Sequence, residues 1–332
     1  MNKRCRISFA AVILALAAMI YVNIITGTVR ITGSELLDIL LGKVTGQMEA
    51  EVLLNIRLPR TVAAVVLGGA LALSGYMLQT FFDNPIVGPF VLGISSGAKL
   101  TVAIALIFLM SRQAKPGSLF LVAAAFVGAL LSMGFVLLIS FKVRSAAILV
   151  VCGIMTGYIC SAITDLVVTF ADDSNIVNLH NWSMGSLSGT SSHDAMIMTI
   201  IIGICLIAAV MLQKPIGAYR LGEAYAFGGG VNIRFLRVML ILISSGLAAT
   251  VTAFAGPISF VGIAVPHLMK GITGTSEPKV MIPGSFLLGA LVTLVCDCIA
   301  RTVFAPTEVS ISSVTAVILV PVVIVVMIKR KR

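Results

Sequence analysis

Apolar runs of about twenty residues recur along almost the whole chain, and each is long enough to cross a bilayer as a helix. Hydrophobic residues make up 59% of the 332 residues, and charged residues make up only 11%. A soluble domain could not bury that much apolar surface, so lipid surrounds most of the chain. The runs are continuous and do not alternate, which excludes a membrane β-barrel. We therefore expect an all-α polytopic membrane protein.

About ten transmembrane helices can be placed. Three basic residues precede the first apolar run, over 7–25, which is longer than the core of a signal peptide and is therefore expected to span. The region 27–56 is mixed and polar, which predicts an outer connection after a first transmembrane helix within 1–26. The other spans are expected at 60–81, 91–111, 118–140, 146–170, 195–213, 237–255, 258–271, 281–300 and 311–328.

Basic residues are divided unevenly between the two sides that ten spans define. With the N-terminus inside, the inner segments hold fifteen of the 23 lysines and arginines, and the outer segments hold seven. Lys99 falls within a span. Cytoplasmic loops carry such an excess of basic residues. The sequence therefore predicts cytoplasmic N and C termini, and it explains the net charge of +10 without a nucleic-acid partner.

Motifs for catalysis, metal binding and nucleotide binding do not emerge from the sequence. The six cysteines form no C-x-x-C pair and lie mostly in apolar runs, where they act as small hydrophobic residues. The three histidines are far apart, so no metal site is expected. The G-x-x-x-x-G-K-[ST] loop is also missing, so any ATP that drives the protein is hydrolysed by another chain. We expect neither an enzyme nor a cofactor bound to this chain.

Two clusters of glycine and proline interrupt the spans. One runs from Asp83-Asn84-Pro85 to Gly97, and the other includes Gly256-Pro257, Gly262 and Pro266. Because the flanking spans run in opposite directions, the two clusters predict an inverted internal repeat. Glycine and proline are also common where membrane helices pack closely. The sequence pattern leaves both interpretations open.

A series of short motifs gives the first indication of a family. In chain order they are RLPRT at 57–61, ALALSG at 70–75, LQ at 78–79, NP at 84–85, LGISSGA at 92–98, WSMGSLSG at 182–189, LGE at 221–223, GVNIR at 230–234, GPISFVG at 256–262, VPH at 265–267, D-x-x-x-R-T at 297–302 and P-x-E at 306–308. In these motifs the chain resembles the FecCD family, the permease subunits of ABC importers for iron-siderophores, haem and vitamin B12. The resemblance runs from about residue 50 to the C-terminus.

The resemblance implies a single permease domain over 1–332, with residues 57–332 as its core, in the cytoplasmic membrane of a bacterium. It implies pairing with a second permease subunit, either the same chain or a paralogue. Two ATPase subunits would bind ATP-Mg on the cytoplasmic side, and an extracytoplasmic binding protein would deliver the cargo. Transport would follow alternating access, with a ferric siderophore as the expected metal chelate and vitamin B12 or haem as alternatives.

The polar island 218–237 matches the family's coupling segment, two short helices seated in a cleft of the ATPase. The implied coupling residues are Tyr219, Leu221, Gly222, Glu223, Tyr225, Ala226, Phe227, Gly230 and Asn232. The aromatic residues and the leucine are candidate anchors, and the glutamate places a charge near a helix start. Two glycines follow Phe227, where relatives continue a helix, and are expected to loosen the second helix.

At the outer face, the resemblance implies that Arg57, Arg60 and Arg301 dock the binding protein through its glutamates, because the guanidinium fork fits a carboxylate. Two alternatives remain open. Arg301 lies four residues after Asp297 and can pair with it on one helix face. The other two arginines can extend toward lipid headgroups.

Lys99 is a candidate for the transport path, because a lysine inside the membrane is costly and is often functional. It either attracts an anionic ferric siderophore or serves structurally, by pairing with Asp165 or Asp297 or by reaching a polar cavity. Ser145 and Ala146 begin the fifth span, which lines the path in the family, and their small size suits an inner gate. A plain positive-inside turn explains them equally well.

A rival from another class is an ion-coupled secondary transporter, which also has broken helices and inverted repeats. It would need a membrane-embedded polar cluster for ion coupling. The candidates for such a cluster are Asp165, Asp297 and Lys99. An intramembrane enzyme would need a nucleophile-base pair or a metal-ligand set, and His267 has no partner motif.

Overall fold

The computed structural model describes residues 3–27, 29, 31–40, 47–110, 118–143 and 145–330, and its regular elements in these ranges are all helical. The elements in chain order are α1 (Lys3–Ile25), α2 (Gly33–Leu40), α3 (Gln47–Val52), a π-helical turn η1 (Leu53–Arg57), α4 (Leu58–Phe82), a 3₁₀ turn η2 (Pro89–Leu92), α5 (Ile94–Met110), α6 (Ser118–Lys142), α7 (Ala146–Val168), α8 (Asp173–Ser183), α9 (Ser192–Met211), α10 (Gln213–Tyr219), α11 (Glu223–Gly228), α12 (Ile233–Ala255), α13 (Val261–Thr273), α14 (Pro278–Thr302) and α15 (Ile311–Arg330).

The expectation of an all-α polytopic membrane protein is confirmed. Each of the ten predicted spans contains a helix, namely α1, α4, α5, α6, α7, α9, α12, α13, α14 and α15. Seven helices of the described residues are long and apolar enough to cross a membrane, and α5 and α15 are shorter apolar helices. The remaining predicted span, α13, has 13 residues. Ten helices therefore occupy the predicted places, and α13 is the shortest of them.

The predicted outer connection is partly helical. Helix α3 continues through η1 into α4, so a single helical stretch of 35 residues runs over Met48–Phe82. A π-helical turn accommodates an extra residue without ending a helix. The second span is thus longer than its apolar run suggests, because its first turns carry glutamates and an asparagine.

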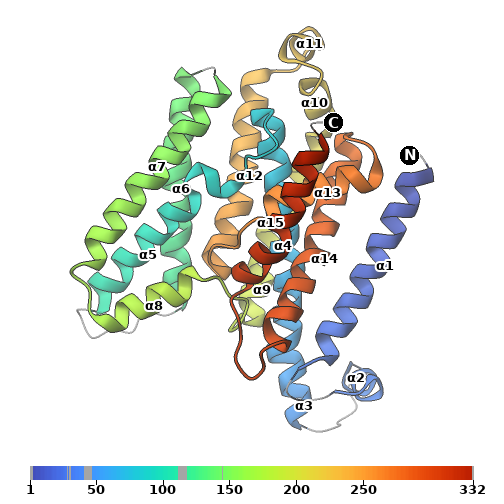
Figure 1. The fold of residues 1–332 in the computed structure, drawn as a ribbon, viewed down its shortest axis with the longest axis vertical. Helices are drawn as coiled ribbons and strands as arrows, with labels where there is room; N and C mark the ends of the chain where they lie inside the picture. The colour runs from blue at the N-terminus through green and yellow to red at the C-terminus, as the bar shows by residue number, and fades with distance from the viewer. Residues whose placement is uncertain are drawn as a thin grey trace.

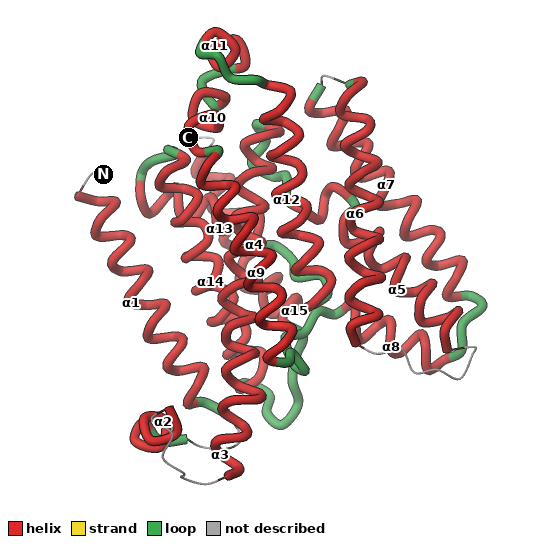
Figure 2. The backbone as a smooth tube through the Cα atoms, turned by 180° about the vertical axis from the view of Figure 1, so that it is seen from behind, coloured by secondary structure: helices red, strands yellow, loops and turns green. Residues whose placement is uncertain are grey.

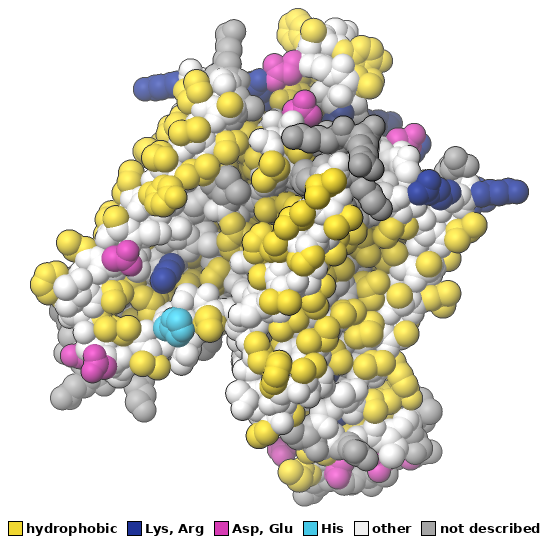
Figure 3. Space-filling view, viewed as in Figure 1, with side chains coloured by type: hydrophobic (Ala, Val, Ile, Leu, Met, Phe, Trp, Pro, Cys, Tyr) yellow, Lys and Arg dark blue, Asp and Glu magenta, His cyan; other side chains and the backbone are white. Residues whose placement is uncertain are grey.

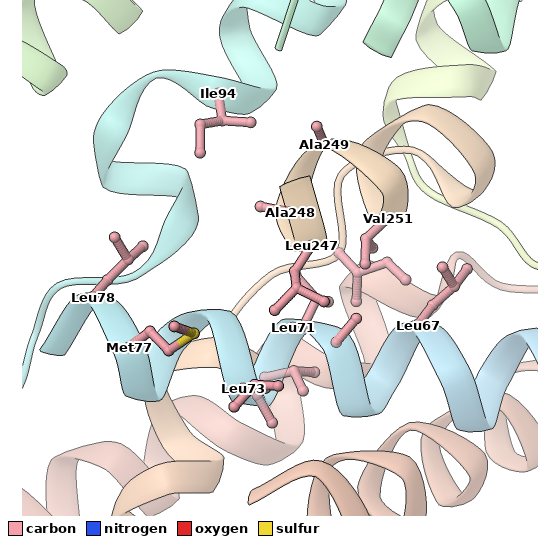
Figure 4. Close-up of a cluster of buried hydrophobic side chains, with 14 of the residues drawn as sticks. Leu67, Leu71, Leu73, Met77, Leu78, Ile94, Leu247, Ala248, Ala249 and Val251 are labelled. Atoms are coloured by element: carbon pink, nitrogen blue, oxygen red, sulfur yellow. The ribbon is translucent and has the colours of Figure 1, made fainter. Parts of the chain in front are cut away.

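Helix α4 lies at the centre of the molecule. Of its most apolar window, 89% is buried, compared with 22% for α7 and α9. Leu71 of α4 lies beside Leu247 of α12, and Leu73 lies on the opposite side of α4 (Figure 4). Small residues let neighbouring helices approach closely. A Cβ placed on Gly75 would lie 1.7 Å from the carbonyl oxygen of Gly262 on α13.

Helices α5, α6, α7 and α8 form a group to one side of this centre (Figures 1 and 2). Many large apolar side chains of α7 are exposed, among them Tyr158 and Leu166. Apolar side chains cover much of the face seen in Figure 3, and charged atoms gather mainly toward its two ends. This distribution fits a protein whose middle is surrounded by lipid.

The two predicted breaks pack against each other beside α4. After α4, Asp83 adopts a left-handed conformation with φ 45°, and α5 begins only after η2. The second break ends at Phe260, with φ 65°, and α13 follows. The amide nitrogen of Gln79 on α4 donates to the carbonyl oxygens of Gly262 and Ile263, at 3.3 and 3.2 Å. Gly256 and Ile258 of the second break are buried in protein, as membrane depth requires, whereas Asp83 and Ile86 of the first break are exposed. The inverted repeat itself stays a prediction.

Both ends of the chain lie toward the end of the molecule that carries α10 and α11, whereas α2 and α3 lie at the opposite end (Figure 1). This arrangement agrees with an even number of spans. Which end faces the cytoplasm stays a prediction from the charge distribution.

Candidate functional site

The segment 218–237 projects as a small helical tip beyond the spanning helices (Figure 1). Gly222 separates α10 from α11 with φ 121°, a conformation that L side chains rarely adopt. Gly230, with φ 81°, turns the chain after α11. Asn232 then caps α12, because its side-chain oxygen accepts a hydrogen bond from the Phe235 amide at 3.0 Å. These local features thus produce helix α10, a turn, helix α11 and the capped start of α12.

Three large apolar side chains of the tip are exposed. Leu221 is 70% exposed, Tyr225 is 63% exposed and Phe227 is 76% exposed, whereas Ala226 is fully buried. Exposed apolar side chains on a polar projection are typical of an interaction surface. We name Leu221, Tyr225 and Phe227 the apolar triad. Helix α11 ends at Gly228, so the glycines that follow Phe227 end the second helix.

Tyr219 and Glu223 anchor the tip from within. The Tyr219 hydroxyl donates to a Glu223 carboxylate oxygen at 3.2 Å and lies 3.5 Å from the Phe81 carbonyl at the end of α4. The same carboxylate pairs with Arg237 at the start of α12. Burial, followed by the nearby carboxylate, raises the pKa of Tyr219 above its usual range, so the phenol stays neutral and can donate. These two residues hold the tip to α4 and α12.

At the opposite end, Arg60 and Arg301 share one buried carboxylate. Asp297 on α14 is 1% exposed. The Arg60 Nε and Nη2 atoms donate to it at 3.0 and 2.7 Å, and the Arg301 Nε atom lies 3.9 Å from its other oxygen. Arg60 also pairs with Glu308, and Arg301 donates to the backbone and side-chain oxygens of Asn23 on α1. The network therefore ties α4, α14 and α1 together.

Arg57 is 4% exposed and donates to three carbonyl oxygens, those of Ile24 and Ile25 in the last turn of α1 and that of Val29 after it. The side chain is thus enclosed by the protein. Its role in docking stays a prediction, and its observed contacts hold the end of α1 against η1.

Lys99 lies half-buried on α5. Among the residues that the structure describes, it forms neither a hydrogen bond nor an ion pair, so the expected pairs with Asp165 and Asp297 are not formed. One turn before it, the Ser96 hydroxyl lies 3.5 Å from that of Ser161 on α7. Lys99, Ser96 and Ser161 thus form a short polar strip along α5 and α7.

The two gate candidates lie at the start of α7. Ser145 is exposed and occupies the N-cap position without a side-chain cap. Ala146 is the first residue of α7, and its side chain lies outside the described residues. The gate therefore stays a prediction.

Sequence reasoning missed Asn23 and the structural use of Glu308. A lone asparagine at the end of an apolar span was a usable signal, because a polar amide at that depth needs a partner. Besides Met19 on α1, its partners are Leu294 and Arg301 on α14, and no local pattern points to these two. In the described part of the chain, no group of three or more His, Cys, Asp or Glu residues could hold a metal ion.

Comparison with known proteins identifies the family. The FecCD transport family matches residues 14–329. The vitamin B12 import system permease proteins BtuC of Salmonella newport (strain SL254) and Salmonella enteritidis PT4 (strain P125109) are each 34% identical over 278 residues, 84% of each chain.

Solved structures agree with this assignment. An inward-facing metal-chelate type ABC transporter matches with a TM-score of 0.86 and 26% identity, over 98% of this chain and 99% of that one. PsaBC from Streptococcus pneumoniae matches with a TM-score of 0.57 and 14% identity, which shows a shared fold alone. The chain belongs to the FecCD transport family and is the membrane-spanning permease subunit of an ABC importer.

Proposed function

We propose that the chain moves a metal chelate, a ferric siderophore, into the bacterial cytoplasm by alternating access. It works with a second permease subunit, two ATPases that dock on α10 and α11, and a binding protein that docks at the opposite end. The observation that carries the proposal is the placement of the exposed apolar triad at one end and the arginine network at the other. ATP chemistry belongs to the partners, and this chain converts their motion into opening and closing of a path.

The ATPase site can be tested at the apolar triad. Replacing Leu221 and Tyr225 together by serine removes two exposed anchors without touching the buried contacts of Tyr219. We expect the ATPase subunits to co-purify poorly with this variant, because a few apolar anchors carry most of an interface. Phe170→Ser is the matched control, since Phe170 is 81% exposed at the end of α7. Undiminished co-purification of the double variant would exclude the tip as the docking site.

At the other end, the proposed docking surface centres on Arg60. Arg60 contacts two carboxylates, and the more exposed one is that of Glu308, whose side chain is 35% exposed. A carboxylate of the binding protein takes the place of Glu308 on the guanidinium, which prefers two-pronged contact with carboxylates. Arg57 and Arg301 hold the surrounding helix ends through their bonds to α1.

Lys99 supports an anionic cargo such as a ferric siderophore, because a cation at membrane depth without an acidic partner attracts negative charge. Vitamin B12 is the second candidate, since relatives of this chain are named as vitamin B12 permeases. Uptake of iron-labelled siderophore should be lower in Lys99→Met cells than in wild-type cells. In wild-type cells, unlabelled vitamin B12 should not compete with this uptake. Unchanged uptake would remove Lys99 from the path, and effective competition would favour vitamin B12 as the cargo.

A further inference from the structure

The three arginines of the proposed docking surface are already engaged within the chain. Arg57 is 4% exposed, and the side chains of Arg60 and Arg301 are each 12% exposed. A carboxylate of the binding protein that displaces Glu308 from Arg60 forms one ion pair and breaks another. Ion pairs that water can reach contribute little in any case. Such an exchange can select a partner, but it supplies little affinity.

Two exposed apolar side chains lie in the loop that carries Glu308. Val303 is 60% exposed and Phe304 is 63% exposed, directly after the end of α14. The connection between α14 and α15 lies toward the same end of the molecule as α2 and α3 (Figure 1). A few apolar and aromatic side chains usually carry most of the binding energy of an interface. We name Val303 and Phe304 the loop pair.

The loop that presents this pair is fixed at two points. The Val309 amide donates to the Ala300 carbonyl oxygen at 3.0 Å, which closes the loop onto the last turns of α14. Within the loop, the Thr307 amide donates to the Phe304 carbonyl oxygen at 2.9 Å. A segment that is already ordered loses little conformational entropy on binding. The loop pair is therefore preorganised for contact with a partner.

The surroundings of the loop pair favour a protein partner from the aqueous side. Aromatic side chains at the end of a spanning helix also meet lipid headgroups. Glu308 lies in the same loop, however, and its side chain is 35% exposed, which indicates water because a carboxylate avoids the hydrocarbon. The pair also belongs to the same loop as the carboxylate that the proposed docking displaces. One partner can therefore contact the apolar pair and Arg60 together.

We propose that Val303 and Phe304 are the apolar anchors of the binding protein, and that the arginine network beside them supplies selectivity rather than affinity. This inference rests on the proposed function, which places the binding protein at this end. The matching surface of that protein would be an apolar patch next to a carboxylate. Apolar contacts depend weakly on salt, whereas exposed charges are screened by it. Loss of the pair would therefore speed dissociation at low and high salt alike.

Docking can be measured with the assembled importer in lipid nanodiscs and its fluorescently labelled binding protein. Phe304→Ser should weaken docking roughly ten- to hundredfold, the effect of one buried aromatic side chain, and the loss should persist at high salt. Phe141→Ser is the matched control. Phe141 is 48% exposed and lies under the Arg234 guanidinium at the start of α12, far from the loop. It should leave docking unchanged, and melting temperatures verify that each variant is folded.

A fluorescent probe identifies what covers the loop pair. In a variant with the six native cysteines replaced, Val303→Cys carries a bimane group and leaves Phe304 intact. Iodide should quench the probe in the importer alone, and the binding protein should then protect it. Quenching by spin-labelled lipid would show that lipid covers the pair, and protection before the binding protein is added would show a second permease subunit there. Either result overturns the inference.

The two measurements also separate this inference from the proposed function. If the wild-type importer does not bind the binding protein, the proposed docking fails and the inference fails with it. If the wild type binds and Phe304→Ser binds equally well, the docking stands and the loop pair is not its anchor. A loss in Phe304→Ser that disappears at high salt would likewise contradict an apolar anchor.

Discussion

Asp297 is the residue on which the stability of the arginine network depends most. Its carboxylate is buried between the guanidinium groups of Arg60 and Arg301. Asp297→Asn would leave two partly buried cations side by side without a full counter-charge. Breaking a buried ion pair costs about 3–5 kcal/mol, so we expect a clear fall in the melting temperature of the purified permease.

Glu308→Gln provides the matched control for this prediction. Glu308 contacts the same Arg60 guanidinium, but its side chain is 35% exposed, and the water there screens the pair. Exposed ion pairs contribute about 0–1 kcal/mol, so this variant should melt close to the wild type. Equal losses in the two variants would contradict the central role assigned to the buried carboxylate.

For single residues, the sequence predicted which side chains are important better than it predicted their contacts. Arg60 and Asp297 were both singled out, but they lie 237 positions apart, and no local pattern reports such a contact. The i, i+4 pair of Asp297 and Arg301 could be predicted because helix geometry fixes it. In the structure that pair is the longer of the two contacts, at 3.9 Å.

Among the elements, the contact between α4 and α13 sets how closely the central helices pack. A Cβ on Gly75 would lie 1.7 Å from the Gly262 carbonyl oxygen, which is backbone and cannot rotate away. Gly75→Ala should therefore push the two helices apart and destabilise the permease by at least about 1–3 kcal/mol, as overpacking does. The melting temperature and the yield of folded protein measure this effect.

Gly203→Ala on α9 is the comparison, because nothing lies within 4 Å of a Cβ placed there. Alanine in a helix interior is favoured over glycine by roughly 0.5–1 kcal/mol, so this variant should be neutral or slightly stabilised. A Gly75→Ala protein as stable as Gly203→Ala would show that the two central helices can separate at little cost.

The helices themselves were largely predictable, because the length of an apolar run is a local property. The helical stretch 47–57 was not, since its glutamates and asparagine resemble a solvated connection. A pocket beside the tip could not be predicted from the sequence either, because residues of α4, α10, α11 and α13 line it together. The Gly/Pro clusters predicted the breaks after α4 and before α13, although Gly97, Gly262 and Pro266 lie inside helices. They did not predict that the two breaks would meet.

On the scale of the whole molecule, the fold places the helical tip 218–237 and both termini at one end and the arginine network at the other (Figure 1). Ten spans and fifteen basic residues on one side predict that the tip faces the cytoplasm. The two ends would then meet different partners, the ATPases and the binding protein. A motion that starts at the tip can reach the far end through α4, which extends along the whole centre.

The orientation can be tested with single cysteines at the two ends. In a variant with the six native cysteines replaced, Phe170→Cys and Tyr225→Cys form a matched pair, because both aromatic side chains are well exposed, at 81% and 63%. A membrane-impermeant maleimide applied to right-side-out vesicles should label Phe170→Cys at once and Tyr225→Cys only after permeabilisation, since the bilayer shields the cytoplasmic end. The reverse order would place the tip outside, where no ATPase could reach it, and would refute the proposed coupling role.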